Sequence, residues 1–550
     1  MLFLDSSRSP LLSQPDTVAN LLRVAAATSL NHGGRSAVRA GDVVIADDVV
    51  IAGAGPTGLA LACGLLAAGV PTRVVDKADG PAITSRALGL QPRGVEVLDR
   101  LAALGDLPQR SVAIAEIAVN INGRQAARLP VGRPTRLVTR PGLLISQAKV
   151  EAQLRRRVGE LGARVGWGRE VLDAEQNGGG VSVRLAGGQS LRTGWLVGCD
   201  GAHSRVRKLA GIGFPGVAII ERFLLADVQA DLPLPHDTAS VWLRGEDVMA
   251  AFPLPGTGLW RLMATAAADG ADEPAPEELL TLIVRLFSER TGYPTSVVQG
   301  AEWTSTFQIH RRLAETYRRG RMLLAGDAAH IHSPLGGQGM NTGLGDAENL
   351  AWKLALVATG RADQALLDSY EAERRPIATE VLESTSAMTR LVLGESPITR
   401  AVRDRLFVPL MNRPLVQRLI WEQASQLKVS YRHGPLARGA HLPLRGHRRP
   451  GDRVPDMSCR RREGGLTRLH AELGAKWVLL TPPTPGGQAC ASVLRDRLGA
   501  EAFTVLEPAD GRVRHALLIR PDGHLAWRGV PVPEALDRWL TAVLRGGRAA

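Results

Sequence analysis

The residues best suited to chemistry are three glycines at G-x-G-x-x-G spacing, Gly53, Gly55 and Gly58. In this pattern the first glycine permits a tight turn, the second lets the backbone approach a pyrophosphate, and the third lets a helix pack closely against a strand. The N–H groups at the start of that helix favour a bound phosphate. Asp76 follows at close to the ~20 residues expected of a carboxylate that holds ribose hydroxyls. The spacing predicts a dinucleotide site.

A second group of candidates lies in the segment 321–346. An apolar run ends at Asp327, whose carboxylate could accept hydrogen bonds from ribityl or ribose hydroxyls. Gly336, Gly337 and Gly339 then precede a predicted helix. Their N–H groups would stabilise negative charge there, such as a pyrophosphate or the N1–C2=O edge of a reduced isoalloxazine.

Asp200-Gly201 form a third candidate, because they follow an apolar, strand-like run. An Asp-Gly pair is also common in ordinary turns, which is the alternative. His330 and His332 could suggest a metal pair, but their i, i+2 spacing has no matching acid, so packing or supporting roles are favoured and no metal site is predicted.

Local patterns predict the elements that position these residues. Val49–Ile51 predicts a buried parallel strand, Leu59–Ala68 a helix and Thr72–Val75 a second strand. The uncharged stretch 49–72 is also long enough for a membrane span. The patterned glycines near its start, followed at once by a β-like run, favour a soluble βαβ unit instead.

Composition narrows the class of protein. A chain of 550 residues predicts two or three domains. Its net charge of +13 comes mostly from scattered arginines without a nucleic-acid-binding motif, so we interpret them as solvated surface charge. The four cysteines are far apart, which disfavours disulfides and zinc. With no signal-peptide pattern in residues 1–47, we expect a cytoplasmic protein.

Further along the chain, residues 214–268 are strand-like and punctuated by proline, and 277–289 predict a helix. Long helices are predicted from Gly343 to about Leu393, and helical connecting segments from 397 to about 433. A stretch rich in glycine and arginine follows. The remaining residues predict a small domain, with strands at Trp477–Leu480 and Ala516–Ile519.

Taken together, the glycine turn, Asp200-Gly201 and the segment 321–346 resemble the motifs of the FAD-dependent aromatic hydroxylases, also called group A flavoprotein monooxygenases. The likeness is greatest to hydroxylases of phenols, aromatic polyketides and related antibiotics. It covers about residues 48–375 and, more loosely, the C-terminal domain. The three motifs occur in the family's order, and that combination is specific.

The resemblance implies roles for matching residues. The glycine turn would line the FAD pyrophosphate, and Asp76 would bind the adenosine ribose, where many members have glutamate. Asp200 and Gly201 match a motif linked to FAD and to passing NADPH, and Pro334–Asn341 would edge the isoalloxazine. The implied cofactor-binding residues are Gly53, Gly55, Pro56, Thr57, Gly58, Asp76, Lys77, Arg86, Gln147, Asp200, Gly201, Gly326, Asp327, Pro334, Gly337, Gln338, Gly339, Met340 and Asn341.

The implied reaction is reduction of flavin by NADPH or NADH, addition of O₂ to form a carbon-4a hydroperoxide, and transfer of one oxygen to an electron-rich ring. The nicotinamide cofactor would dock transiently, since no second fingerprint is visible. The protein would mainly position substrate and exclude water, and no catalytic side chain is named. Candidates for an aromatic substrate wall, for which core packing is the alternative, are Phe252, Trp260, Met263 and Phe307.

The predicted fold class is α/β, with a Rossmann-like FAD-binding domain, an inserted β-sheet substrate domain and a C-terminal thioredoxin-like domain. The resemblance to the thioredoxin-like module rests on Leu517–Gly529, but no cysteine pair is present, so Cys490 predicts a structural or dimer-supporting role. The predicted parts are a flexible extension (1–47), the FAD-binding domain (48–213 and 301–395), the substrate domain (214–300), a helical connector (396–435) and the thioredoxin-like domain (436–550).

Three alternatives stay open. A Baeyer–Villiger or epoxidising monooxygenase would use the same flavin, and a flavin or ligand-binding protein without turnover would share the binding residues. A flavin halogenase is disfavoured because no W-x-W-x-I-P element appears. The expected partners are a small aromatic substrate and O₂, with no nucleic acid and no membrane, and the chain is expected to be a monomer or homodimer.

Overall fold

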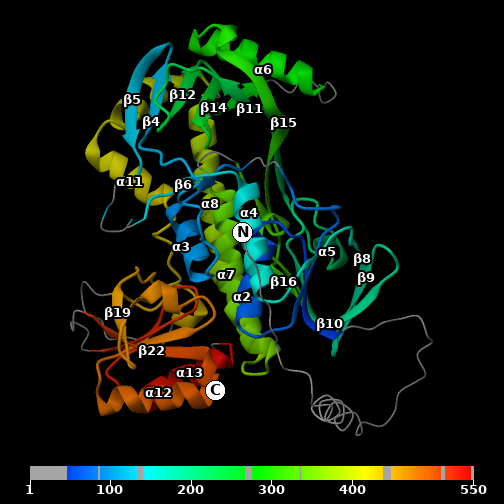
Figure 1. The fold of residues 1–550 in the computed structure, drawn as a ribbon, viewed down its shortest axis with the longest axis vertical. Coiled ribbons are helices and arrows are strands. Elements are labelled where there is room, and N and C mark those ends of the chain that lie inside the picture. The colour runs from blue at the N-terminus through cyan, green and yellow to red at the C-terminus, as the bar shows by residue number, and fades with distance from the viewer. Residues whose placement is uncertain are drawn as a thin grey trace, which may run out of the picture. The chain divides into compact units, whose positions relative to one another are not determined.

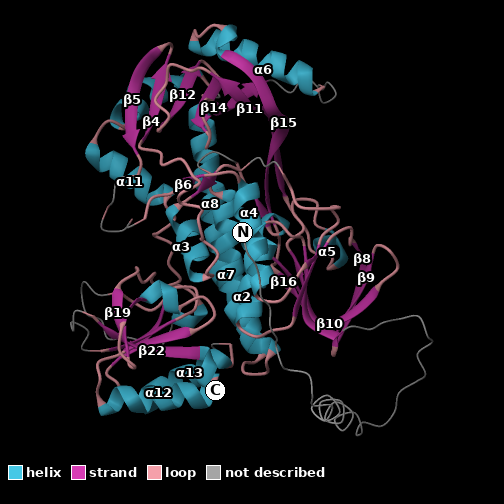
Figure 2. Cartoon of the chain, viewed as in Figure 1, coloured by secondary structure: helices cyan, strands magenta, loops and turns pink. Residues whose placement is uncertain are grey.

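The structure is a computed structural model that describes residues 46–83, 87–132, 135, 138, 140–266, 275–333, 337–394, 396–437, 448–509 and 515–546. These residues belong to one compact unit of the chain. Figure 1 follows the chain through this unit, and Figure 2 separates its helices from its strands. The extension predicted over 1–47 lies outside the described residues, except for Ala46 and Asp47, which begin the first strand.

The first sheet is built around the predicted βαβ unit. β1 (Ala46–Ala52), α2 (Pro56–Ala67) and β2 (Thr72–Val75) follow one another, which confirms that prediction. β1 pairs in parallel with β2 and with β10 (Ser190–Gly198), and β10 pairs in parallel with β17 (Met322–Leu324). The sheet is completed by β7 (Val165–Gly166), β8 (Val171–Asn177), β9 (Gly180–Leu185) and β16 (Arg318–Arg319).

Helices pack beside this sheet because their apolar faces need cover. α2 packs against α4 (Gln147–Glu160) and α7 (Gly339–Ala358), and α7 contacts α3 (Pro92–Arg100) and α8 (Asp368–Leu393). The long helices predicted from 343 to 393 are thus α7 and α8. Smaller elements of this region are β3 (Gly89–Leu90), β6 (Leu143–Leu144) and α5 (Arg205–Leu209).

A second sheet has the strand order β18-β15-β11-β14-β13-β12-β4-β5. One face is covered by α6 (Pro276–Thr291), whose Leu279, Ile283 and Phe287 join the apolar core there. Its strands are β4 (Glu116–Ile121), β5 (Arg124–Pro130), β11 (Gly216–Ala230), β12 (Thr238–Arg244), β13 (Asp247–Pro253), β14 (Leu259–Ala266), β15 (Val298–Leu313) and β18 (His330–Ile331).

This sheet draws on more of the chain than the predicted segment 214–300. The hairpin β4–β5 joins it through parallel pairing of β4 with β12, and β15 extends it to Leu313. The range predicted for the FAD-binding domain, 48–213 and 301–395, includes β4, β5 and most of β15, whereas these strands pair in the second sheet. The reason for this difference is that β4 pairs with a strand far along the chain, which no local pattern encodes.

The C-terminal residues form a six-stranded sheet of order β20-β19-β22-β21-β23-β24 with helices packed on it. β21 (Trp477–Leu480) and β23 (Ala516–Ile519) coincide with the predicted strands. The other elements are β19 (Ser458–Arg461), β20 (Leu466–Arg468), β22 (Phe503–Pro508), β24 (Leu525–Gly529), α12 (Pro485–Leu498) and α13 (Pro533–Leu544).

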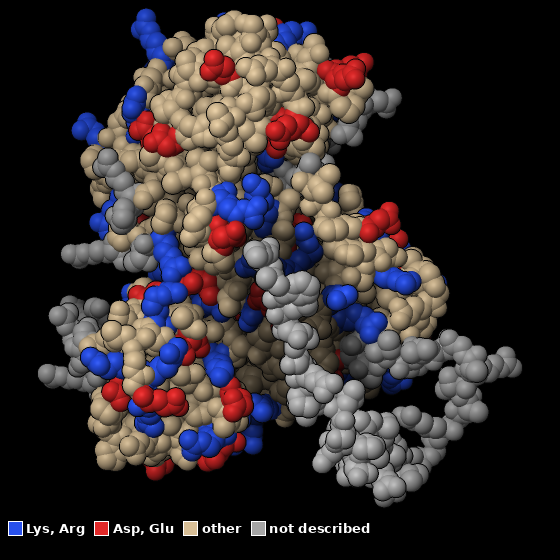
Figure 3. Space-filling view, in the orientation of Figure 1, with Lys and Arg blue, Asp and Glu red and all other residues tan. Residues whose placement is uncertain are grey.

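The predicted helical connector contains α9 (Pro397–Val402), α10 (Val408–Leu410) and α11 (Pro414–Ala424). None of the helices in the described part of the chain combines the length and apolar character needed to cross a bilayer. On the face drawn in Figure 3, basic and acidic side chains are intermingled rather than gathered into one basic stripe.

Candidate functional site

The predicted motifs meet along one edge of the first sheet. Gly53 follows β1, Asp76 follows β2, Asp200 follows β10 and Gly326 follows β17. These four strands are neighbours and run parallel, so their carboxyl ends lie side by side. Ligands of open α/β sheets bind outside such carboxyl ends.

Gly53 joins the first turn to the Asp200 segment. Its φ is +104°, and a Cβ on it would lie 2.2 Å from the Cys199 carbonyl oxygen. Gly58 is equally constrained, since its Cβ would lie 2.0 Å from the Gly53 carbonyl oxygen. Only glycine fits at either position, as the fingerprint predicts.

Thr57 joins the same turn to the segment 321–346. A Cβ on Gly326 would lie 2.5 Å from Thr57 Oγ1, and a Cβ on Gly343 would lie 2.3 Å from the same atom. α2 and α7 therefore approach with almost no space between them, and segments far apart in sequence line one site.

Space for a ligand remains beside Gly55. A Cβ built there meets no heavy atom within 4 Å, and α2 begins directly after it without a side-chain cap. The free N–H groups of that first turn suit a phosphate. Asp76 completes the cradle: its Oδ2 accepts a hydrogen bond from Ala54 N at 2.6 Å and its Oδ1 one from Ala78 N at 2.9 Å. These features fit the pyrophosphate and ribose of FAD.

Asp200 has one occupied and one open carboxylate oxygen. Oδ2 accepts hydrogen bonds from Arg205 N at 2.7 Å and Val206 N at 3.1 Å, which caps α5. Oδ1 is buried and has no partner among the described residues. Arg207 links this turn to the segment 321–346 by donating a hydrogen bond to the Ala328 carbonyl oxygen at 2.9 Å.

Behind Gly326 lies a carboxylate that the sequence analysis treated only as part of a helix. Asp346 is fully buried, and its Oδ2 accepts a hydrogen bond from Gly326 N at 3.0 Å and lies 2.6 Å from His330 Nε2. Its Oδ1 accepts a hydrogen bond from Arg374 Nε at 2.8 Å. Burial alone would raise the pKa of Asp346, but His330 and Arg374 hold it below its usual value. The buried Asp346 carboxylate thus holds the turn that carries Asp327 in place.

Asp327 itself is exposed, although the surrounding protein desolvates its carboxylate enough to raise its pKa. An exposed carboxyl group at this position can bond hydroxyl groups of a ligand that lies against it.

Comparisons with known proteins show which family the chain belongs to. Residues 46–385 match the family model described as FAD binding domain, and residues 447–545 match that of the aromatic-ring hydroxylase C-terminal region. The chain belongs to the FAD-dependent aromatic hydroxylases. It is a flavin-dependent monooxygenase, and its cofactor is FAD.

Its relatives are similar over nearly their whole length. It is 35% identical to the 6-methylpretetramide 4-monooxygenase of Streptomyces rimosus, covering 88% of this chain and 90% of that one. It is 36% identical to the rifampicin monooxygenase of Streptomyces venezuelae, covering 91% and 100%. The solved anhydrotetracycline hydroxylase OxyS of Streptomyces rimosus superposes with a TM-score of 0.73 at 34% identity, covering 92% and 100%.

In the hydroxylase, Asn341 holds the segment expected to edge the isoalloxazine. Its Oδ1 accepts a hydrogen bond from Gln91 N at 2.9 Å, and its Nδ2 donates to the carbonyl oxygens of Gly89 and Gly337 at 3.1 and 2.8 Å. The side chain is buried, so it shapes the backbone rather than offering free polar atoms.

The remaining predicted cofactor residues are less informative. Gln147 is the first residue of α4 and donates a hydrogen bond to Glu151 Oε1 at 2.8 Å. Lys77 is exposed next to Asp76. Arg86 and Pro334 lie outside the described residues.

The four substrate candidates divide between the two faces of the second sheet. Phe252, Met263 and Phe307 lie half-buried on the face opposite α6, because their cross-strand partners share that side. Phe307 stacks on Phe223 at 5.5 Å. Trp260 points the other way, into the core under α6.

A buried ion pair that the sequence analysis missed lies on the same face as Met263. Arg261 donates hydrogen bonds to both Asp227 oxygens, at 2.6 and 2.7 Å, and lies over the ring of Trp303 at 5.1 Å. Neither charge has a local sequence signal, since the two residues meet only through strand register.

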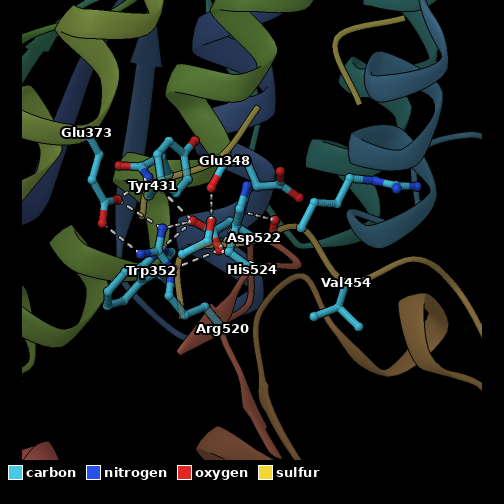
Figure 4. A network of polar contacts seen from close by, with 12 residues as sticks. Glu348, Trp352, Glu373, Tyr431, Val454, Arg520, Asp522 and His524 are labelled. Carbon is cyan, nitrogen blue, oxygen red and sulfur yellow. Dashed lines mark hydrogen bonds and ion pairs between the residues drawn. The ribbon is translucent and has the colours of Figure 1, made fainter. Parts of the chain in front are cut away.

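A network of buried charges links α7 and α8 to the C-terminal sheet, as Figure 4 shows. Arg520 donates to both oxygens of Glu373, and Lys353 Nζ lies 2.8 Å from Glu373 Oε2. Asp522 accepts hydrogen bonds from Trp352 Nε1 at 3.2 Å and from Asn349 Nδ2 at 3.4 Å. The C-terminal turn at 520–524 therefore supports the helix whose start lies at the flavin site.

Buried arginines correct the interpretation of the arginines as solvated surface charge, which is wrong at several positions, Arg261 and Arg403 among them. Arg93, Arg100, Arg374 and Arg520 are each at most 4% exposed. Burial alone would raise the pKa of Glu373, but Arg520 and Lys353 hold it at about 2. Burial lowers the pKa of Lys353 to about 8.

Proposed function

We propose that the enzyme hydroxylates a bulky aromatic compound of the polyketide or antibiotic type. The proposal depends on one observation above all: four motif residues lie at the adjoining carboxyl ends of four parallel strands. The names of the relatives, which act on tetracycline intermediates and rifampicin, support this substrate class.

FAD, when bound, supplies the redox chemistry by taking a hydride from NAD(P)H and activating O₂. The balanced reaction consumes Ar–H, O₂, NAD(P)H and H⁺ and yields Ar–OH, H₂O and NAD(P)⁺. The chain's own residues bind FAD and orient it. The first turn of α2 beside Gly55 holds the pyrophosphate, Asp76 the adenosine ribose, and Asp327 the ribityl hydroxyls.

The start of α7 stabilises negative charge on the reduced ring system. Its first N–H groups, at Gly339, Met340 and Asn341, have no earlier turn to bond to, and they carry the positive end of the helix dipole. A fixed positive potential of this kind needs no rearrangement as charge develops.

The face of the second sheet opposite α6 forms the substrate wall. Phe252 and Phe307 supply flat aromatic contacts and Met263 a flexible apolar one, and the Arg261–Asp227 pair adds a polar group to the same face. We leave Trp260 out of this wall because it packs under α6. An apolar wall that excludes water also protects the reactive flavin from side reactions.

The finer architecture belongs to the same proposal. We assign a Rossmann-like FAD-binding domain, a β-sheet substrate domain that includes β4, β5 and β15, and a C-terminal thioredoxin-like domain without redox function. The mixed C-terminal sheet supports the thioredoxin-like assignment, and the absence of a C-x-x-C pair from the sequence of this region, with Cys490 buried, supports the absence of redox function.

Turnover with defined aromatics tests the function. Purified protein should be yellow, and anhydrotetracycline or rifampicin should stimulate its NAD(P)H oxidation and gain one oxygen atom. Product structure then separates ring hydroxylation from Baeyer–Villiger insertion or epoxidation. Protein that cannot be reconstituted with FAD would refute the proposal, and bound FAD without stimulated oxidation by any aromatic in a broad screen would favour a binding protein.

A further inference from the structure

His332 lies in the segment that leads from β18 to the start of α7. Its ring Nδ1 is 2.9 Å from the Ser333 carbonyl oxygen. A carbonyl oxygen can only accept, so Nδ1 carries the hydrogen and Nε2 carries a lone pair. Burial lowers the pKa of His332 to about 4, which keeps the ring neutral at pH 7.

The orientation of this ring is fixed by its neighbours. It stacks on His330 with the ring planes 9° apart and the centroids at 6.5 Å. Ser333 is itself anchored, because its Oγ accepts a hydrogen bond from Thr389 Oγ1 of α8 at 2.9 Å. The lone pair on Nε2 therefore points in one defined direction.

That lone pair is unsatisfied. His332 Nε2 is buried and has no hydrogen-bond partner among the residues that the structure describes. Leaving a buried acceptor unpaired costs about 1–3 kcal/mol, so such atoms ordinarily meet a partner from the protein, water or a ligand.

The position of Nε2 indicates which partner. A Cβ on Gly339, the first residue of α7, would lie 3.8 Å from Nε2 and 3.7 Å from Cε1. The acceptor thus lies beside the N–H groups of the first turn of α7. One acceptor next to several donors suits a ligand that presents an N–H or O–H close to a carbonyl or other electron-rich oxygen.

A metal site does not explain the arrangement. The stacked ring of His330 contacts Asp346 through Nε2 at 2.6 Å, and within the described part of the chain the two histidines do not form a group at metal-ligand spacing. Among the described residues, the group with metal-ligand spacing is Asp99, Asp456 and His470, elsewhere in the molecule. There Arg468 already pairs with both carboxylates.

We propose that His332 Nε2 accepts a hydrogen bond from a ligand bound at the start of α7. The donor is either the ring N3–H of the flavin or a hydroxyl of the aromatic substrate. This inference rests on the proposed function, because it takes FAD and an aromatic to be the ligands. His332 is a binding and positioning residue in either case.

Two substitutions of His332 distinguish the roles of its two ring nitrogens. In His332→Asn the amide nitrogen can replace Nδ1 and keep the hydrogen bond to Ser333, but no atom replaces Nε2. In His332→Gln the amide oxygen can reach the place of Nε2 and supply an acceptor. Loss of one hydrogen bond weakens binding about tenfold, so the Asn variant should show that loss and the Gln variant should recover most of it.

The flavin arm uses FAD and 3-methyl-FAD, which lacks the N3–H. If the flavin is the donor, the wild type prefers FAD about tenfold, the Asn variant shows no preference, and the Gln variant regains it. If the substrate is the donor, all three proteins bind both flavins alike. The Asn variant then binds anhydrotetracycline about tenfold more weakly, with KM raised more than kcat is lowered.

Equal melting temperatures of the three apoproteins exclude a folding defect. The inference is overturned if the Asn variant matches the wild type in both arms, or if Asn and Gln weaken binding equally. If the wild type binds no anhydrotetracycline, the comparison of FAD with 3-methyl-FAD alone decides whether the inference holds. A wild type that binds no flavin refutes the proposed function itself, which is a separate result.

Discussion

Arg520 and Glu373 are joined by two hydrogen bonds, at 2.8 and 3.0 Å, although 147 positions separate them in the chain. Both side chains are buried, and Arg520 also pairs with Asp522. Because Glu373 lies on α8 and bonds Lys353 and Asn349 of α7, the C-terminal turn is part of the support of the flavin-site helix.

Replacing Arg520 should therefore be costly. Arg520→Met leaves Glu373 and Asp522 as buried, under-neutralised charges, and removing one partner of a buried pair costs about 3–5 kcal/mol. Urea unfolding measures this loss. Arg497→Met is the matched control, since the Arg497–Asp537 pair is about 40% exposed. It should lose less than about 1 kcal/mol, and equal losses in both variants would contradict the buried network.

Two glycines of the first turn should respond differently to a methyl group. Gly53→Ala places a Cβ against the Cys199 carbonyl oxygen at a φ that disfavours alanine, so both folding stability and FAD affinity should fall. Gly55→Ala meets open space in the protein, so the melting temperature of the apoprotein should stay unchanged while FAD affinity falls. Calorimetry and flavin titration check both. Normal FAD binding by Gly55→Ala would place the pyrophosphate elsewhere.

Met263 and Trp260 lie on opposite faces of the second sheet, so their replacement should affect substrate binding and stability differently. Met263→Ala should raise KM for the aromatic substrate with little change in stability, because Met263 is half-buried on the face opposite α6. Trp260→Ala removes a side chain that is 2% exposed, and deleting such a core residue costs about 3–5 kcal/mol. Steady-state kinetics and urea unfolding distinguish them. A stable Trp260 variant with raised KM would reverse the assignment of the faces.

Stability should fall as the pH drops from about 6.5 to 4. Burial lowers the pKa of His524 to about 4, so in this range the unfolded chain takes up a proton that the folded chain does not. Above pH 6.5 the two states bind equally few protons there, and below pH 4 the penalty is complete, at roughly 3 kcal/mol.

His524→Phe tests this origin, because phenylalanine keeps the ring contact with Tyr431 but cannot titrate. The variant should show a shallower decline of unfolding free energy between pH 6.5 and 4. An unchanged slope would show that His524 does not contribute. A further decline below pH 4.5 is expected in both proteins, since the pKa of Glu373 is held at about 2.

Local patterns were sufficient to predict the βαβ unit and the strands at Trp477–Leu480 and Ala516–Ile519. Their signals lie within a few residues: an apolar run, a glycine spacing, a turn. The pairing of β4 with β12 could not be predicted, because strand partners distant in sequence carry no local mark.

The supporting charges were missed for a related reason. Arg374 and Arg520 cannot be told from solvated arginines until the fold brings Asp346 and Glu373 to them. Residues 520–524 form the hairpin turn between β23 and β24, but the role of that turn depends on helices from another part of the chain.

The four cysteines have a practical consequence. Cys63 in α2, Cys459 in β19 and Cys490 in α12 are buried, and Cys199 is half-buried beneath the first glycine turn. Burial raises the pKa of Cys63 to about 12 and that of Cys490 to about 11. Alkylating reagents will thus modify these thiols only when the surrounding element opens. Labelling rates followed by mass spectrometry can therefore measure the rate of local opening around each cysteine in the unaltered enzyme.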